Sequence, residues 1–232
     1  MKSKIFSLMF LLFIACTVST TAVKAYSQPK TYNSTVKVNK NAKAYNILKI
    51  KKNTMKNYTI TSSNTKVASV SASGVIKGLK KGSAVVKLVS KSNNKTYANI
   101  NVTVKNNYTK KQLRLMSSII YSEAGAECYA GKKAVGIVIM NRVKSSSFPN
   151  SLNGVIYQPH QFGPVSNGSL NKSLSLYDSG KLNKDCIKAA RFALNHNKNI
   201  SYKGKNINMS SYLFFSGYVS GARLQIQNHQ FK

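Results

Sequence analysis

Hydrophobic and polar positions alternate in short stretches along the first part of the chain. Residues 35–38 read Thr-Val-Lys-Val and residues 100–104 read Ile-Asn-Val-Thr-Val, which places the aliphatic side chains of each stretch on one face of a strand. Turns are indicated at Ser73-Gly74 and Lys81-Gly82. About seven strands at this spacing predict an all-β sandwich over residues 30–105.

The period of the apolar positions changes after Asn106-Asn107. Thr109 and Gln112 have the spacing of a capping box at the start of a helix. The next apolar residues recur at helical spacing: Leu113, Met116, Ile119 and Ile120. Further helices are predicted over residues 130–143 and 184–195, and strands over residues 212–215 and 223–226. Residues 108–232 are therefore predicted to form an α+β, mainly helical domain.

The first 25 residues follow neither pattern. A basic start, an apolar run and the small-residue site Val23-Lys24-Ala25 predict a secretory signal peptide over residues 1–25. The alternative is a lipoprotein signal in which Cys16 is acylated. No later stretch approaches the roughly 20 apolar residues of a membrane helix. The sequence thus predicts a secreted protein without a stable membrane span.

The chain carries 36 lysine and arginine residues against four aspartate and glutamate residues, a formal net charge of +32. Such a charge favours polyanionic partners. For a secreted protein we expect anionic cell-wall polymers and no nucleic acid, because there is no glycine-rich phosphate loop, zinc-finger spacing or RNP-like aromatic motif. The alternative is that the lysines reflect only a proteome rich in Lys, Asn and Ser.

Few side chains can carry chemistry. Residues 26–105 contain no acid, histidine or cysteine, which indicates a binding or spacer module. Cys128 and Cys186 can form a disulfide or lie as separate buried residues, and the sequence leaves both open. The three histidines lack the spacing of metal ligands, so neither a metal nor a cofactor is predicted.

Two of the four acids, Glu123 and Glu127, lie in the segment from residue 121 to 136. Glu123 follows bulky apolar residues at the end of the predicted helix. Desolvation and the helix dipole both raise the pKa of a carboxyl there, which suits a general acid. The alternative is an exposed glutamate paired with one of the many lysines.

Two longer segments resemble known families. Residues 62–88 read SSNTKVASVSASGVIKGLKKGSAVVKL, which resembles the bacterial immunoglobulin-like group 2 domain and leaves its ligand open. Glu123-Ala124-x-x-Glu127, the segment AVGIVIMNRVKSSSFPNSLNGVIYQPHQF of residues 134–162, and the ending Asn-His-Gln-Phe of residues 228–231 are similar to the cell-wall hydrolase family of spore cortex-lytic enzymes. Three positions depart from that family: Ala126 and Gln227 replace glycines, and Cys128 replaces a proline.

The second resemblance implies a lysozyme-like catalytic domain that cleaves peptidoglycan as a lytic transglycosylase, with Glu123 as its acid/base and Glu127 in a supporting role. Asn141 and Arg142 end a predicted helix and are expected either to cap it or to order the cleft. Residues expected to bind the glycan, or alternatively only to pack, are Tyr157, Gln158, Gln161 and Phe162, with Glu127 and Asn141 behind them.

Two other functions stay open at this point: an N-acetylmuramoyl-L-alanine amidase and a non-catalytic wall-binding protein. The resemblance also implies a location at the cell wall or in the spore. Whether the substrate is vegetative wall or spore cortex is likewise open.

Overall fold

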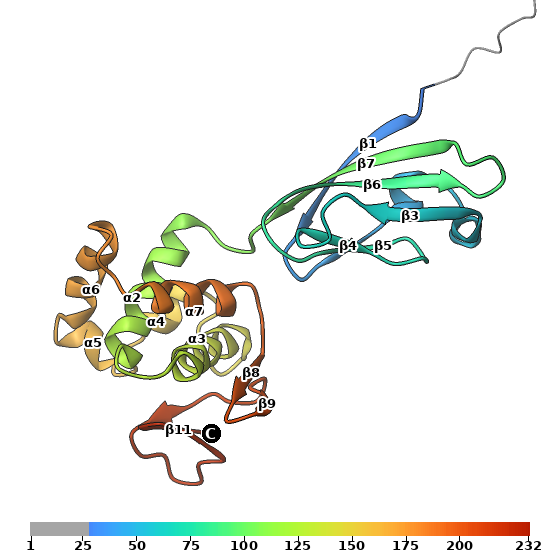
Figure 1. Cartoon of the computed structure of the whole chain (residues 1–232). Coiled ribbons are helices and arrows are strands. Elements are labelled where there is room, and N and C mark those ends of the chain that lie inside the picture. Colours follow the sequence, from blue (N-terminus) through green and yellow to red (C-terminus); the bar gives the residue numbers. More distant parts are fainter. Residues whose placement is uncertain (1–27) are drawn as a thin grey trace, which may run out of the picture.

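The computed structural model describes residues 28–232, and the chain folds into two parts of different architecture (Figure 1). The N-terminal part is built mainly of strands and the C-terminal part mainly of helices. The predicted signal peptide, residues 1–25, lies outside the described residues. From residue 28 onward, no helix is long and apolar enough to cross a bilayer.

Seven strands of the N-terminal part form two sheets around one core. The first sheet has the order β1 (Lys30–Lys37), β7 (Thr96–Lys105), β6 (Gly82–Ser90) and β3 (Tyr58–Ser62), with β1 parallel to β7. The second sheet has the order β2 (Asn41–Lys43), β5 (Val75–Gly78) and β4 (Ala68–Val70). The short helix α1 (Ala44–Ile47) and the 3-10 helix η1 (Lys52–Asn57) connect β2 to β3, so this part is not purely β.

Strand β7 shows how the alternating pattern builds this core. Ile100, Val102 and Val104 are buried on one face, as predicted, while the residues between them lie toward solvent. Gly74 sits between β4 and β5 with φ +78, a conformation that glycine adopts without strain. A Cβ there would approach Met55 Sδ to 2.6 Å, so the turn also needs a glycine for space.

Three helices form the centre of the C-terminal part: α2 (Lys110–Ala124), α3 (Tyr129–Lys144) and α7 (Lys184–Leu194). The capping box is confirmed, because Gln112 N donates to Thr109 Oγ1 at 3.2 Å and Thr109 N donates to Gln112 Oε1 at 2.8 Å. The predicted helices over 130–143 and 184–195 are confirmed as α3 and α7. Helices α4 (Leu152–Ile156), α5 (Gly163–Ser166) and α6 (Ser169–Asp178) lie between them and were not predicted.

Helix α3 packs closely between α2 and α7 at Gly136. A Cβ at this position would lie 2.9 Å from Ile120 Cδ1 and 3.0 Å from Ala193 Cβ, both closer than normal contacts. The absence of a side chain therefore lets the three helices approach one another. This packing brings the end of α2 and the end of α3 into one region.

Short strands complete the C-terminal part. They form a hairpin of β8 (Asn199–Tyr202) and β9 (Lys205–Asn208), and a sheet in the order β10 (Phe215–Ser216), β12 (His229–Phe231) and β11 (Leu224–Ile226). The predicted strand over 223–226 is confirmed as β11. The predicted strand over 212–215 is confirmed only at its end: β10 begins at Phe215, and Phe214 exchanges two backbone hydrogen bonds of 2.9 and 3.0 Å with Lys232, whereas residues 212 and 213 precede the strand.

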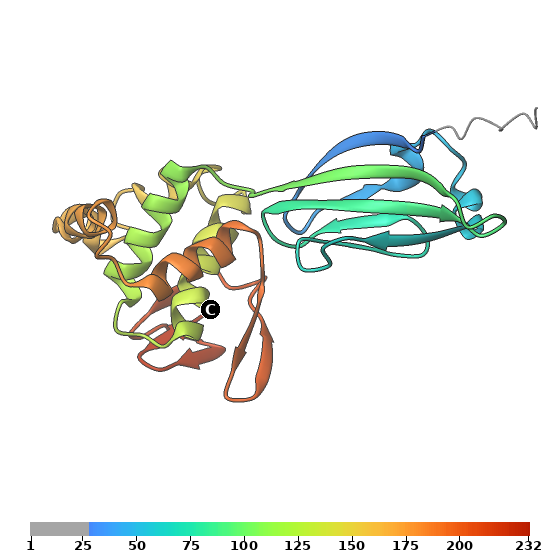
Figure 2. The same ribbon diagram turned by 45° about the horizontal axis from the view of Figure 1, so that its top comes forward.

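Asparagine side chains join the two parts, which lie end to end in Figure 2. Asn39 Nδ2 donates to Asn195 O at 2.9 Å and to Asn197 Oδ1 at 3.1 Å. Asn107 Nδ2 donates to Val38 O at 2.8 Å. Each part has its own buried core, so these polar contacts orient two independently packed bodies.

Candidate active site

Glu123 lies in the last turn of α2 and is half-buried. Burial raises the pKa of its carboxyl, and the guanidinium of Arg142 acts in the opposite direction with a smaller effect. The ion pairs within residues 28–232 involve Asp178 and Asp185, so the alternative of a glutamate paired with a lysine is wrong for Glu123. The expected desolvated carboxyl is confirmed.

Arg142 lies in the last turn of α3 and is only 5% exposed. Its Nε donates to Leu213 O at 2.7 Å, and Cζ lies 5.2, 5.4 and 5.7 Å from the ring centres of Phe148, Phe162 and Phe214. Burial lowers its pKa and Glu123 raises it, but a guanidinium stays charged in proteins. The site therefore holds a fixed cation among aromatic rings, and its charge acts on the pKa of the Glu123 carboxyl without a direct hydrogen bond or ion pair between the two side chains.

One amino group of Arg142, Nη1, is buried and has no hydrogen-bond partner. Buried donors are almost always paired in folded proteins, so an unpaired one is an available binding group. The Glu123 carboxyl, whose pKa is raised, retains its proton at higher pH than an exposed glutamate does. The arrangement can deliver a proton and stabilise the carboxylate that remains.

The other three acids of the chain are engaged elsewhere. Asp178 accepts two hydrogen bonds of 2.6 Å from Arg114, and Asp185 accepts one of 3.0 Å from Lys188. Glu127 is 6% exposed in the turn between α2 and α3; its Oε1 accepts from Asn228 Nδ2 at 3.2 Å, and its Oε2 is buried without a hydrogen-bond partner. Glu123 is thus the one acid of the chain without a hydrogen bond or ion pair within the described residues.

Glu127 belongs to a clasp between this turn and the turn that joins β11 to β12. Cys128 N donates to Gln227 Oε1, and Lys132 Nζ donates to Glu127 O. A Cβ on Gly131 would lie 3.0 Å from Glu127 Cβ, so the glycine makes room for the buried glutamate. These contacts agree with a supporting role for Glu127 and give it the task of fixing the turn after Glu123.

The clasp joins two of the positions that depart from the resembled family. A proline at Cys128 would have no N–H to donate, and a glycine at Gln227 would have no side chain to accept. Gln227 has φ +47, in the left-handed region that favours glycine, at the first position of a two-residue turn. In this chain the two replacements contact each other, so the hydrogen bond offsets part of the strain at Gln227.

Comparisons with known proteins agree with this division of the chain. Residues 126–232 match the family described as Cell Wall Hydrolase, and residues 20–100 match the Bacterial Ig-like domain (group 2). Most of the C-terminal part thus matches a cell wall hydrolase domain. The match begins three residues after Glu123, and it contains Arg142 and the clasp. The prediction of a chain with more than one domain is confirmed.

Two curated proteins to which the chain is similar are named spore cortex-lytic enzyme. The one from Bacillus cereus is 42% identical over 77 residues, which is 33% of this chain and 30% of the relative. The one from Bacillus subtilis (strain 168) is 40% identical over 63 residues, which is 27% of this chain and 21% of the relative. The chain thus matches less than a third of the length of each relative.

Two solved structures are also similar to this chain. One is titled as the catalytic domain of the germination-specific lytic transglycosylase SleB from Bacillus anthracis, with 27% identity, a TM-score of 0.41, and coverage of 55% of this chain and 98% of that chain. The other, the catalytic domain of the Bacillus cereus SleB protein, has 28% identity, the same TM-score, and coverage of 53% and 91%.

The predicted contact residues of the hydrolase domain fall into two groups. Tyr157, 48% exposed, and Gln161 lie at the surface, and Gln158 has a buried amide oxygen without a partner. Phe162 is 4% exposed and Asn141 6%, so neither offers a face to a sugar, and we correct both to packing positions. Asn141 Nδ2 donates to Met209 O and Tyr212 O, which ties α3 to the segment before β10.

Tyr157 lies toward the other end of α2 from Glu123. The pKa of Arg114, near the start of the helix, is raised mainly by its hydrogen bonds to Asp178, with a smaller contribution from Tyr157. Arg142 was expected to cap its helix or order the cleft, but the rings of Phe148 and Phe214 around it were not among the predicted site residues. Arg142 and Phe148 stand in the segment that carries the family resemblance, so the Asn-Arg-Val and Phe-Pro motifs were the signal that could have found them.

The cysteine side chains and the histidines, which were considered as a disulfide pair and as metal ligands, contribute no chemistry to the site. Cys128 and Cys186 are both free, and burial raises the pKa of the Cys186 thiol to about 11. The structure therefore has two separate cysteines and no disulfide between them. Within residues 28–232, no group of three His, Cys, Asp or Glu side chains could hold a metal ion.

Proposed function

We propose that this protein cleaves the glycan strand of peptidoglycan next to N-acetylmuramic acid, as a lytic transglycosylase with Glu123 as its acid/base. The observation that carries the proposal is the contrast between Glu123, a desolvated carboxyl on which the charge of Arg142 also acts, and the three acids that accept hydrogen bonds. The cell wall hydrolase match and relatives named spore cortex-lytic enzyme support the same substrate class. A lysozyme-like fold is part of this proposal.

A single carboxyl restricts the possible reactions. Glycosidases that hydrolyse with two carboxyls place them about 5 to 9.5 Å apart, across the scissile bond. In this chain Glu127 is buried in the clasp, and Asp178 and Asp185 are held by Arg114 and Lys188. A single carboxyl suffices if the attacking oxygen comes from the substrate itself, and we propose that it does.

We therefore propose the following step. The Glu123 carboxyl gives its proton to the glycosidic oxygen as the bond from C1 of N-acetylmuramic acid to that oxygen breaks. The C6 hydroxyl oxygen of the same sugar bonds to C1, and the Glu123 carboxylate takes the hydroxyl proton. No water is consumed, Glu123 regains its proton, and the product carries a 1,6-anhydro end. Arg142 stabilises the transient carboxylate.

The signal peptide and the N-terminal part complete the proposal. We infer that the protein is secreted and acts in the turnover of cell wall or spore cortex, where the Ig-like part holds it on peptidoglycan and on anionic wall polymers. The absence of acids, histidines and cysteines from residues 26–105 supports a role in binding and not in bond cleavage.

Mass spectrometry of digests of vegetative peptidoglycan and spore cortex tests the proposal. We expect muropeptides with 1,6-anhydro ends, lighter by one water than hydrolytic products. Reducing muramic acid ends would contradict the transglycosylase step, and free peptide stems would identify an amidase. An absence of any product from both substrates would identify a non-catalytic wall-binding protein. The two digests together also decide between wall and cortex as the preferred substrate.

A further inference from the structure

A groove of about 1170 Å³ lies between the two parts, at the start of α2. We call it the junction groove. Its N-terminal wall comes from the turn between β5 and β6 and from the end of β7, and its other wall from α2 and α7. Glu123 lies 13 residues after Lys110 along α2, or about 20 Å at 1.5 Å per residue, so the groove is separate from the candidate active site.

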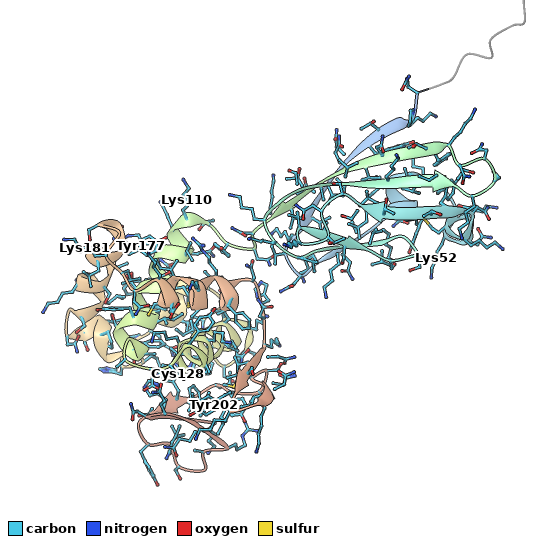
Figure 3. All side chains as sticks on the ribbon, viewed as in Figure 1. Lys52, Lys110, Cys128, Tyr177, Lys181 and Tyr202 are labelled. Atoms are coloured by element: carbon cyan, nitrogen blue, oxygen red, sulfur yellow. The ribbon has the colours of Figure 1, made fainter. Side chains whose placement is uncertain are left out.

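Figure 3 shows the same separation: Lys110 lies at the upper edge of the helical part beside the N-terminal part, and Cys128, in the turn after Glu123, lies near its lower edge. The groove exceeds the roughly 300 to 1,000 Å³ of typical small-molecule sites. Its size suits a segment of a polymer.

Cationic side chains from both parts line the junction groove. Its lysines are Lys80, Lys81, Lys105, Lys110 and Lys111, all of them exposed. Their ammonium groups have no hydrogen bond or ion pair among the residues from 28 onward, where the ion pairs are Arg114–Asp178 and Lys188–Asp185. Arg191 adds a further exposed cation from α7. No carboxylate of the described residues pairs with these lysines, so their charge is free to attract an external anion.

The kind of cation indicates the kind of anion. A guanidinium can bind a planar carboxylate in a bidentate manner. Arg114 already does so, because it donates to both carboxylate oxygens of Asp178. The free groups are mostly lysines, which act as point charges and bind phosphate oxygens without a fixed planar geometry. They are also spread over two domains, which suits anions repeated along a chain better than one compact anion.

Between the lysines, the groove offers partly apolar surface from Leu79, Tyr108 and Tyr177. Such surface can pack against the carbon backbone of a polymer between successive phosphates. The asparagine contacts Asn39–Asn195 and Asn107–Val38 hold the two walls in place, so the site exists only when both domains are present.

We propose that the junction groove is a binding site for a phosphodiester chain, and we assign it to a polyol phosphate polymer of the cell wall. The site places the chain across both domains and leaves the region of Glu123 open to a glycan strand. Its existence does not depend on the reaction proposed for Glu123, because the two regions share no residue.

Binding of the full mature chain to purified poly(glycerol phosphate), measured by fluorescence anisotropy over a range of salt concentrations, tests the proposal. The variant is the quadruple Lys80→Gln, Lys81→Gln, Lys110→Gln, Lys111→Gln. The control is Lys49→Gln, Lys66→Gln, Lys172→Gln, Lys205→Gln, which removes the same charge from exposed lysines outside the groove, again two from each domain.

We expect the groove variant to bind at least about 10-fold more weakly at low salt. The slope of log Kd against log salt should fall by roughly 0.7 for each phosphate group that the variant no longer neutralises. The control should change much less in both respects. Equal effects in the two variants would show that only net charge matters and would overturn the site. Thermal unfolding should show both variants folded, and both should cut soluble glycan fragments at the unaltered rate.

Two further probes of matched charge decide the chemistry. Poly(glutamate) should bind more weakly than poly(glycerol phosphate), and equal binding would overturn the preference for phosphodiesters. Single-stranded DNA presents the same linkage on a different backbone. Tighter binding of DNA than of the wall polymer, abolished in the groove variant, would overturn the assignment to a wall polymer.

Discussion

The two ends of α2 each place an arginine near a carboxylate, with opposite results. Near the start, Arg114 and Asp178 form two hydrogen bonds of 2.6 Å in solvent, and these bonds lower the pKa of Asp178. At the end, burial raises the pKa of Glu123, and the nearby Arg142 offsets only part of that effect. An arginine and an acidic residue thus give an ionised carboxylate near the start of α2, and a carboxyl that keeps its proton to higher pH at its end.

The difference shows that direct contact and burial compete in setting the state of a carboxyl. Asp178 is fully exposed, so its charge costs little, and the hydrogen bonds decide the direction of the shift. Glu123 has no hydrogen bond and lies among apolar groups, so desolvation decides it. The carboxylate of a surface ion pair stays ionised and bound to its partner, so it cannot donate a proton. A desolvated acid keeps its proton and can donate it, and a nearby cation fixed by other groups can stabilise the carboxylate that remains.

Replacing the two carboxyls gives the largest expected contrast. Glu123→Gln removes the transferable proton while keeping the shape of the side chain, and we expect the rate of glycan cleavage to fall at least ~100-fold. Asp178→Asn, the matched change at the other end of α2, should leave the rate near that of the wild type. Initial rates on soluble glycan fragments measure both.

Glu127→Gln keeps the acceptor for Asn228 and should lose much less activity than Glu123→Gln. A Glu123→Gln protein that still cuts well would contradict the single-carboxyl mechanism. A loss of similar size in Asp178→Asn would mean that the two ends of α2 are not independent.

Replacing the two arginines gives a smaller contrast. Arg142→Met should raise the pKa of Glu123 further, because a cation that favours the carboxylate is removed. We expect the rate to fall on the order of 10-fold, since the transient carboxylate loses its counter-charge, and the alkaline limb of the profile of kcat/KM against pH to move to higher pH. Arg114→Met should change neither quantity. An alkaline limb that moves to lower pH in Arg142→Met would contradict the arrangement.

The sequence carries the local features of this fold. Alternation in residues 100–104 and the capping box at Thr109 and Gln112 are decided by neighbours in the chain, and both were predictable. Helix α6 was not, because its sequence, SLNKSLSLYD, is rich in residues of low helix propensity. Tertiary contacts stabilise it, including the 2.7 Å hydrogen bond between Ser173 Oγ and Ser122 Oγ on α2.

The candidate site divides in the same way. The direction of the Glu123 pKa shift was predictable, because the apolar residues that precede it on α2 indicated a desolvated carboxyl. The contact of Arg142 with Phe214 joins residues 72 positions apart, and only the folding of the C-terminal segment onto α3 brings them together. Phe162 was misjudged because residue type alone does not tell whether an aromatic ring faces solvent or the core.

The clasp after α2 gives a prediction of smaller size. Cys128 has φ −65, which a proline can adopt, but Cys128→Pro removes the N–H that Gln227 Oε1 accepts. Gln227→Gly relieves the positive φ and removes the acceptor. Each change breaks the same hydrogen bond, so the double variant should be more stable than the sum of the single changes implies, by about 1 kcal/mol. Urea denaturation of the four proteins measures this coupling, and additive free energies of unfolding would show that the two replacements are unrelated.

The dependence of stability on pH gives the finest contrast, because the two carboxyls should act with opposite sign. The folded protein binds the Glu123 proton more tightly than the unfolded chain does. Its contribution to stability is therefore complete below the unfolded pKa, about 4.3, and declines as pH rises through the folded pKa. Asp178 has a lowered folded pKa, so its contribution is present above the unfolded pKa, about 3.9, and is lost as pH falls through the folded value.

Relative to the wild type, the Tm of Glu123→Gln should increase from pH 4 to pH 8, whereas that of Asp178→Asn should increase as pH falls below 4, and only slightly because the pair is exposed. Thermal unfolding by circular dichroism in buffers of equal ionic strength measures both differences. A Tm difference for Glu123→Gln that stays constant from pH 4 to pH 8 would mean that Glu123 titrates like an exposed glutamate, and the contrast between the two ends of α2 would then lose its physical basis.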